Sequence, residues 1–120
     1  MDLGWCDVCL RVKSAQSSRT FYEGLGFRKV EGEEESGWAV VTNGDLRLGL
    51  FESQHMGENH VSLNFRGGDV FTIAQTLAEN GYSFASGPNG SADGGASASL
   101  RDPDGHLIFF DTAPGEQKPE

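Results

Sequence analysis

Four segments of the chain alternate between apolar and polar side chains, and the polar set contains groups that can bind or react with a small molecule. A period of two residues is typical of β-strands that present different faces to their surroundings. One face is apolar and is expected to lie under helices; it consists of Val8, Leu10, Val12, Leu46, Leu48, Leu50, Val61, Leu63, Phe65, Ile108 and Phe110. The other face mixes charged, polar and aromatic side chains, namely Asp7, Cys9, Arg11, Arg47, Gly49, Phe51, His60, Ser62, Asn64, Leu107, Phe109 and Asp111.

This mixed face predicts a ligand-binding cavity, because apolar walls with a few placed polar groups are what a small-molecule site needs. The alternative is a sheet face that lies open to solvent, but that arrangement would leave the rings of Phe51 and Phe109 in water. A third interpretation is catalytic and needs no metal. A buried carboxylate at Asp7 beside His60 would form an acid/base pair tuned toward neutral pH.

The two cysteines, Cys6 and Cys9, lie three residues apart, a spacing that also occurs in redox and zinc sites. On a strand, residues three apart point to opposite faces, so the two sulfur atoms diverge. We therefore interpret both as reduced thiols with a structural role in a reducing compartment.

Composition excludes several classes of partner. The chain has 120 residues, enough for one domain, and its 18 acidic and 9 basic residues give a net charge of −9. Nucleic-acid binding needs clustered Lys and Arg and is not expected. No apolar run approaches the roughly 20 residues of a membrane span, and the first residues lack the basic and apolar regions of a secretory signal. We expect a cytoplasmic protein that binds neither nucleic acid nor membrane.

Periodicity predicts ten elements of secondary structure. Strands are expected at 5–13, 27–30, 38–42, 46–51, 60–66, 82–85, 96–101 and 106–111, and helices at 15–25 and 70–80. Two further segments are expected to be irregular. The acidic run 31–35 predicts a solvated turn, and the Gly- and Ser-rich stretch 86–95 predicts a loop, acting either as a mobile lid or as a plain connector.

The order strand–helix–strand–strand–strand occurs twice. The pattern Val8-x-Leu10-x-Val12 in the first half recurs in the second half as Val61-x-Leu63-x-Phe65. Such a repeat predicts a single α+β domain over residues 1–112, built from two βαβββ modules at about 5–52 and 59–112 that share a core. The tail at 113–120 is expected to be flexible.

Two short motifs resemble a known superfamily. The segment Phe21-Tyr22-Glu23-Gly24-Leu25-Gly26-Phe27 is similar to the one that follows the first strand in the vicinal oxygen chelate superfamily, which includes glyoxalase I, bleomycin-resistance proteins, fosfomycin-resistance enzymes and extradiol dioxygenases. The segment Arg101-Asp102-Pro103-Asp104-Gly105-His106 resembles the turn before its last strand. The resemblance covers about residues 5–112. It implies two βαβββ modules that form curved mixed sheets around a cavity, in a chain that pairs as a homodimer.

The resemblance also implies where a divalent metal would bind, with ligands on the first, fourth, fifth and eighth strands. His60 matches the fifth-strand position, and Asp7 stands where a His is usual. Glu52 is the nearest fourth-strand carboxylate, but the alternation along its strand puts it on the face away from the cavity. Phe109, at the eighth-strand position, cannot ligate a metal. Arg47 on the same face adds a positive charge that opposes a dication. We therefore expect no cofactor, with a divalent metal as the alternative.

The function implied by this resemblance is that of a metal-free homodimer, similar to the bleomycin-resistance proteins, that binds a small antibiotic-type molecule between its modules. Whether it also catalyses a reaction stays open at this point. Stacking would come from Trp38, Phe51 and Phe109, and hydrogen bonds from Asp7, His60, Asn64 and Asp111. Arg11 and Arg47 would favour a carboxylate-bearing ligand, so the charge of the ligand stays open. The alternative is a metal-dependent lyase, isomerase or dioxygenase, in which the metal polarises two neighbouring oxygen atoms.

Overall fold

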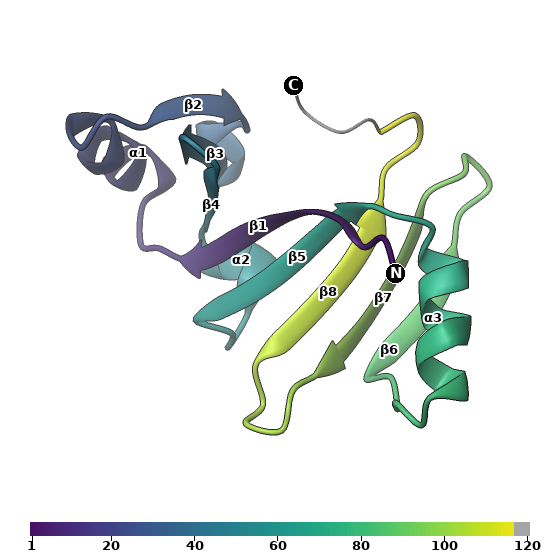
Figure 1. The fold of residues 1–120 in the computed structure, drawn as a ribbon. Coiled ribbons are helices and arrows are strands. Elements are labelled where there is room, and N and C mark those ends of the chain that lie inside the picture. Colours follow the sequence, from purple (N-terminus) through teal and green to yellow (C-terminus); the bar gives the residue numbers. More distant parts are fainter. Residues whose placement is uncertain (117–120) are drawn as a thin grey trace. The chain divides into compact units, whose positions relative to one another are not determined.

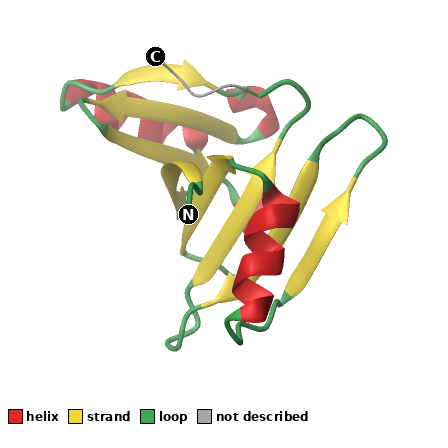
Figure 2. Ribbon diagram, turned by 45° about the vertical axis from the view of Figure 1, so that its right-hand side comes forward, coloured by secondary structure: helices red, strands yellow, loops and turns green. Residues whose placement is uncertain are grey.

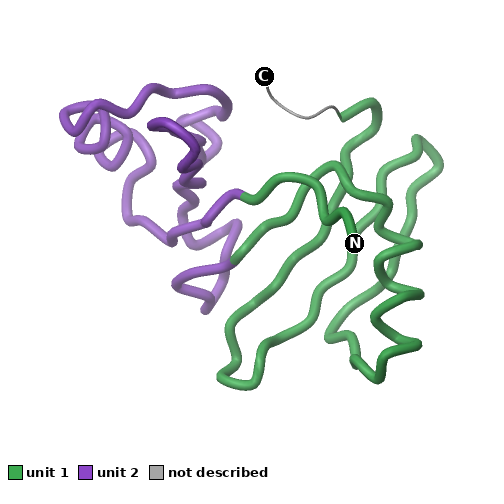
Figure 3. Tube along the Cα trace, viewed as in Figure 1, with its two compact units in different colours: residues 1–6, 63–120 green, residues 7–62 purple. Residues whose placement is uncertain are grey.

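The computed structural model describes residues 1–116; the last four residues of the predicted tail at 113–120 lie outside the described residues. The described chain divides into two compact units, coloured in Figure 3. Unit 1 comprises residues 1–6 and 63 onward, and unit 2 comprises residues 7–62. Strands β1 (Gly4–Arg11) and β5 (Val61–Gly67) each have residues in both units.

Unit 2 contains one long helix, two short helical turns and four hydrogen-bonded strands in the order β2-β3-β4-β1. Besides β1, its elements are α1 (Ala15–Gly24), β2 (Arg28–Glu31), η1 (Glu34–Ser36), β3 (Trp38–Asn43), β4 (Leu46–Phe51) and α2 (Ser53–Met56). Strand β3 pairs antiparallel with β2 and β4, and β4 pairs parallel with β1. The parallel pair makes this a mixed sheet.

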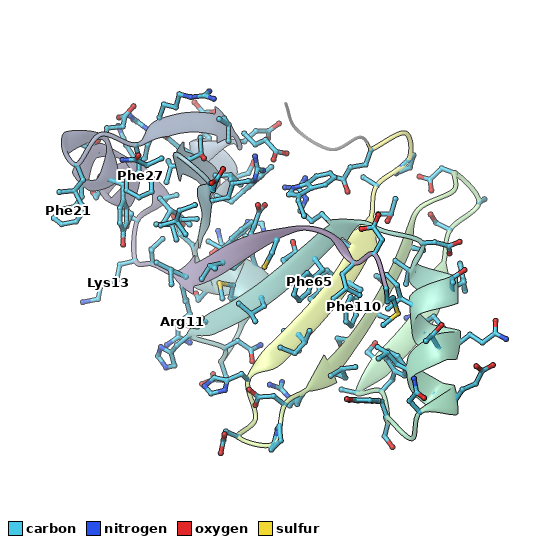
Figure 4. The ribbon with its side chains drawn as sticks, in the orientation of Figure 1. Arg11, Lys13, Phe21, Phe27, Phe65 and Phe110 are labelled. Carbon is cyan, nitrogen blue, oxygen red and sulfur yellow. The ribbon has the colours of Figure 1, made fainter. Side chains whose placement is uncertain are left out.

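Helix α1 begins at a side-chain cap and covers the apolar face of the unit 2 strands. The Ser14 hydroxyl accepts a hydrogen bond from the Ser17 backbone N–H at 3.1 Å, which satisfies one of the free donors of the first turn. Beneath the helix lies a core of Val41, Leu48 and Leu50, packed by Val8, Leu10, Val12, Tyr22 and Phe27. In Figure 4 Phe27 follows this helix, whereas Phe21 projects from it into solvent and is 64% exposed.

Unit 1 contains one helix and four strands in the order β5-β8-β7-β6. Besides β5, its elements are α3 (Val70–Glu79), β6 (Ser86–Gly90), β7 (Ala96–Arg101) and β8 (Leu107–Thr112). Strand β7 pairs antiparallel with β6 and β8. Helix α3 runs beside these strands and packs against β6, β7 and β8 (Figures 1 and 2).

The core of unit 1 lies between α3 and one face of its strands. Asp69 caps α3 through a 3.1 Å hydrogen bond from the Thr72 backbone N–H to its carboxylate. That bond, followed by one from the Thr72 hydroxyl, holds the pKa of Asp69 below its usual value. Phe65 and Phe110 stack with their centroids 5.7 Å apart and lie side by side in Figure 4. The buried residues of this core are Val70, Ile73, Ala98, Leu100 and Phe110.

The architecture confirms the α+β fold and the twofold order of elements predicted from the sequence. Both long helices lie within a residue of their predicted bounds, because caps and glycines define their ends. The Asp102 turn also forms, since the carboxylate of Asp102 accepts hydrogen bonds from the backbone of Asp104 and His106. Local chemistry was therefore sufficient for these two helices and for this turn.

The prediction for residues 82–90 is wrong, whereas 91–95 form the loop expected there. The expected strand at 82–85 does not form, and a strand, β6, lies at Ser86–Gly90 inside the expected loop. Every residue of β6 is exposed, and Ser, Gly, Pro and Asn have low strand propensity, so no hydrophobic pattern marks it. Strand β6 is the last in the strand order and pairs with β7, so it is an edge strand. An edge strand tolerates a Pro such as Pro88.

Three smaller predictions also need correction. The short elements η1 and α2 were not predicted, because three or four residues cannot show a helical period. The acidic run is not wholly solvated, since Glu31 ends β2 and Glu34 pairs with Arg19. Leu46 and Val61 are 47% and 43% exposed rather than buried under helices, because each starts its strand beyond the reach of the helix.

No helix within residues 1–116 is long and apolar enough to cross a membrane.

Gly49 is the position in β4 at which a side chain is least tolerated. A Cβ atom there would lie 2.6 Å from Cε2 of Phe51, closer than real Cβ contacts, and 3.0 Å from Sγ of Cys9, tighter than most of them. We predict that Gly49→Ala lowers the free energy of unfolding by about 1–3 kcal/mol through overpacking. Urea denaturation measures this loss.

Gly24→Ala is the matched control, because no atom lies within 4 Å of its Cβ and it sits in the last turn of α1. It should stabilise the protein by about 0.4–1 kcal/mol. Equal stabilities for the two variants would show that the ring of Phe51 does not lie over Gly49.

Candidate functional site

The nine residues predicted to bind a ligand divide between the two units. Six lie in unit 2, namely Asp7, Arg11, Trp38, Arg47, Phe51 and His60, and three lie in unit 1, namely Asn64, Phe109 and Asp111. Each group is described within its own unit.

Unit 1 has a pocket of about 290 Å³ on the face of its strands that α3 does not cover. Phe109 and Asp111 alternate along β8 with the core residues Ile108 and Phe110, so their side chains point away from the helix. The lining residues are Asn89, Gly90, Ser91, Gly95, Ala96, Ser97, Phe109, Asp111, Thr112 and Ala113. The pocket therefore combines one aromatic ring with hydroxyl, amide and carboxylate groups.

Phe109 and Asp111 line this pocket, and Asn64, the third predicted residue of unit 1, contacts both of them. The side-chain amide of Asn64 donates a 2.7 Å hydrogen bond to Oδ1 of Asp111 and a 3.4 Å contact to the backbone oxygen of Phe109. Ser97 pairs with Asp111, and Ser99 with Phe109, in the register of β7 and β8. The amide of Asn64 thus orients the carboxylate that lines the pocket.

A tight turn forms one rim of the pocket. The backbone N–H of Ser91 donates to the oxygen of Gly95 at 2.9 Å, and the backbone N–H of Gly95 donates to Asp93 at 3.1 Å. The Ser91 hydroxyl also donates to Asp93, and this bond and the one from Gly95 hold the pKa of the Asp93 carboxyl below its usual value. Part of the segment proposed as a lid is therefore an internally hydrogen-bonded turn.

In unit 2, Arg47 bridges two carboxylates. Its Nε lies 2.5 Å from Oδ1 of Asp7 on β1, and its Nη2 lies 2.7 Å from Oε2 of Glu31 on β2. Asp7 is only 2% exposed, and the side chain of Arg47 is 13% exposed. Burial by itself lowers the pKa of Arg47, but the hydrogen bonds and charges of Asp7 and Glu31 outweigh it, and the pKa is raised above its ordinary value. The guanidinium is thus permanently charged.

Trp38 and Phe51, the two aromatic residues predicted to bind a ligand in unit 2, form a separate cluster with His55. Trp38 and Phe51 stack nearly parallel, with centroids 5.6 Å apart and planes 5° from each other. The ring of His55, from α2, meets Phe51 edge-on at 5.8 Å, and its Nε2 lies 2.6 Å from the backbone oxygen of Ser36. The two stacking groups predicted for unit 2 are therefore stacked on each other.

Arg11 and His60 also contact each other. Nη2 of Arg11 lies 3.1 and 3.2 Å from the two ring nitrogens of His60, and Nη1 donates to the backbone oxygen of Gly57 at 2.7 Å. Figure 4 shows Arg11 at the end of β1.

The sequence matches the family description Glyoxalase/Bleomycin resistance protein/Dioxygenase superfamily over residues 3–110. This match covers most of the chain. The chain belongs to that superfamily.

Solved structures of the superfamily share its fold. The chain is 16% identical to a glyoxalase/bleomycin resistance protein/dioxygenase superfamily member from Vibrio splendidus 12B01, with a TM-score of 0.69 over 90% of this chain and 97% of that one. It is 22% identical to a protein from Legionella pneumophila described as an NAD-dependent benzaldehyde dehydrogenase, with a TM-score of 0.74 over 89% and 97%. It is 14% identical to methylmalonyl-CoA epimerase from Mycobacterium tuberculosis, with a TM-score of 0.61 over 92% of this chain and 87% of that one. None of the curated proteins compared with the sequence matches it.

The donor set does not fit the divalent metal that the superfamily resemblance implies. Asp7 is hydrogen-bonded to Arg47, and His60 to Arg11. Glu52 accepts a hydrogen bond from the backbone N–H of Ala15 at 2.9 Å, at the start of α1. Within residues 1–116, no three His, Cys, Asp or Glu side chains lie close enough together to hold an ion. A metal at these positions would have to displace a guanidinium.

Two residues of these clusters were not predicted. Glu31 was assigned to a solvated run, and no local signal shows that a strand register would bring it to Arg47. The sequence carries no signal for His55, because the short helix α2 that positions it has no helical period. In both cases the missing information is a long-range contact.

The ion pair between Asp7 and Arg47 should contribute strongly to the stability of this superfamily member. Arg47→Met leaves a buried carboxylate without its cation, and we predict a loss of about 3–5 kcal/mol in the free energy of unfolding. In the double variant Asp7→Asn/Arg47→Met the buried negative charge of Asp7 is also removed, so the loss in the free energy of unfolding should fall to about 1–2 kcal/mol. Chemical denaturation of the four proteins of this cycle measures the coupling.

Arg19→Met provides the control, because Arg19 pairs with Glu23 and Glu34 on the surface of unit 2. Such exposed pairs contribute about 0–1 kcal/mol. A loss for Arg47→Met as small as that for Arg19→Met would contradict a buried pair.

Proposed function

We propose that this protein is a metal-free member of the superfamily that binds a small, flat, cationic molecule of antibiotic type in the pocket of unit 1, and that it works as a homodimer in the cytoplasm. The observation that carries the proposal is the pairing of Phe109 and Asp111 in one pocket. The ring supplies a stacking surface, and the carboxylate, oriented by Asn64, supplies a charge-assisted acceptor.

The charges around the candidate residues favour a cation. Asp111 is the one ionisable residue among those that line the pocket in the described part of the chain. The two arginines that would attract an anionic ligand are both engaged within unit 2, Arg47 by carboxylates and Arg11 by His60 and Gly57. The net charge of −9 also attracts cations at long range.

The size of the pocket limits what it can hold. Pockets for drug-sized ligands measure roughly 300–1,000 Å³. A volume of about 290 Å³ suits one or two rings of a ligand rather than the whole of a large antibiotic. The rest of a larger ligand would lie outside this pocket.

A metal-dependent lyase, isomerase or dioxygenase is the weaker candidate. Its metal would need Asp7 and His60, and both are hydrogen-bonded to arginines. The metal-free acid/base hypothesis also loses support, because the side chain nearest to Asp7 on this face is Arg47, which cannot act as a base.

Calorimetric titration with bleomycin, and with benzamidine as a minimal flat cation, tests the ligand chemistry. We predict binding by the native protein, weakened roughly 10- to 100-fold by Asp111→Asn, because a charged hydrogen bond is lost. Phe109→Ala should weaken binding roughly 3- to 10-fold through loss of ring contact. Asp104→Asn, which removes a carboxylate from the exposed β7–β8 turn, is the control and should change nothing. If neither compound binds at millimolar concentration, or if Asp104→Asn weakens binding as much as Asp111→Asn, the proposal fails.

The homodimer is tested separately by sedimentation equilibrium. Large apolar side chains remain exposed in each unit, among them Phe21, Leu25, Phe71 and Tyr82, and a second copy would cover such groups. We predict twice the 12.9 kDa mass of one chain at micromolar concentration. The mass of a single chain at several hundred micromolar would contradict the dimer and leave ligand binding open.

A further inference from the structure

Arg47 lies where three strands of unit 2 bring opposite charges together. It projects from β4, which pairs parallel with β1 and antiparallel with β3, and its guanidinium contacts Asp7 of β1 and Glu31 of β2. Its Nη2 approaches both carboxylates, lying 2.7 Å from Oε2 of Glu31 and 3.4 Å from Oδ2 of Asp7. One nitrogen atom thus lies between oxygen atoms of two different strands.

Two carboxylates in such a position need a cation between them. Asp7 is almost fully buried, and a buried charge is tolerated only when it is paired and hydrogen-bonded. Oxygen atoms of Asp and Glu are the ligands that hard divalent cations such as Mn²⁺ and Mg²⁺ prefer. In this chain the cation is instead a covalently attached guanidinium, which cannot lose its proton.

We propose that Arg47 is the resident cation of an oxygen site formed by Asp7 and Glu31, and that this single side chain excludes divalent cations from unit 2. A dication approaching the two carboxylates meets a fixed positive charge at hydrogen-bond distance from both. Without the guanidinium, the carboxylate oxygens of Asp7 and Glu31 keep the chemistry that hard dications prefer, with water completing the coordination of the metal. The inference rests on the metal-free part of the proposed function and is independent of ligand binding in unit 1.

Mn²⁺ titration, followed by electron paramagnetic resonance and by thermal melting, tests this inference. We expect the native protein to bind no stoichiometric Mn²⁺ at this site. Arg47→Ala should bind one Mn²⁺ per chain, with an affinity at least roughly tenfold above that of the native protein, because a unit charge beside the site has been removed. A hundredfold excess of Mn²⁺ over its dissociation constant should raise the melting temperature of this variant by roughly 10 °C relative to EDTA.

Arg47→Gln is a second variant that keeps polar contacts without the charge, so that a folding defect of Arg47→Ala does not prevent the test. Two controls isolate the site. Arg11→Ala removes another arginine of unit 2, whose side-chain hydrogen bonds run to Gly57 and His60, and it should gain no Mn²⁺ binding. Asp7→Asn/Arg47→Ala should lose the binding that Arg47→Ala gains.

The outcomes separate this inference from the proposed function. Gain of Mn²⁺ in either Arg47 variant, lost when Asp7 is also changed, supports the resident cation. If neither variant binds more Mn²⁺ than the native protein, or if the gain survives Asp7→Asn, the inference is overturned while the metal-free function stands. Stoichiometric Mn²⁺ in the native protein, released by Asp7→Asn, would overturn both.

Discussion

An ionised carboxylate buried in a sheet requires a cation beside it, and in unit 2 that requirement is met by Arg47. Asp7 is 2% exposed and bonds the guanidinium on one side, while Glu31 bonds it on the other. Removing one partner of such a pair lowers the free energy of unfolding far more than replacing the whole pair with apolar residues does. The three residues come from β1, β2 and β4, so this single contact also ties the strands of the unit together.

The faces on which the candidate residues lie carry different side chains in the two units. In unit 2, Arg47 lies between carboxylates, and the ring of Phe51 lies over Gly49 and stacks on Trp38. The charged groups thus pair with one another, and the two rings stack on each other. In unit 1, the corresponding face carries Phe109 and Asp111 beside small residues of β6 and β7, and a pocket remains. Both units contain the order strand–helix–strand–strand–strand, but unit 2 also contains η1 and α2, and α2 supplies His55. The difference therefore comes from side-chain size and charge together with these short helices. It directs the search for a ligand to unit 1.

Much of the fold was predictable from the sequence because its signals are local. Alternation separated Phe110 from Phe109 and Asp111, and it placed Asp7 and Arg47 on one face, as their ion pair confirms. The contact between Glu31 and Arg47 was not predictable, since it depends on the register across β2, β3 and β4. Strand β6 was missed because its exposed Ser, Gly, Pro and Asn residues pair through backbone groups alone. Sequence alone therefore predicted that Asp7 and Arg47 share a face, but neither the part played by Glu31 nor which of these charges neutralise one another.

The central claim is that a guanidinium, and not a metal ion, lies between the carboxylates of Asp7 and Glu31. A crystal structure of the native protein grown with excess Mn²⁺, with anomalous data collected for manganese, tests it most directly. The account predicts no anomalous peak within bonding distance, about 2.2 Å, of either carboxylate, with the Arg47 guanidinium bonded to both. A strong peak between these oxygen atoms, with the side chain of Arg47 turned away from them, would contradict it.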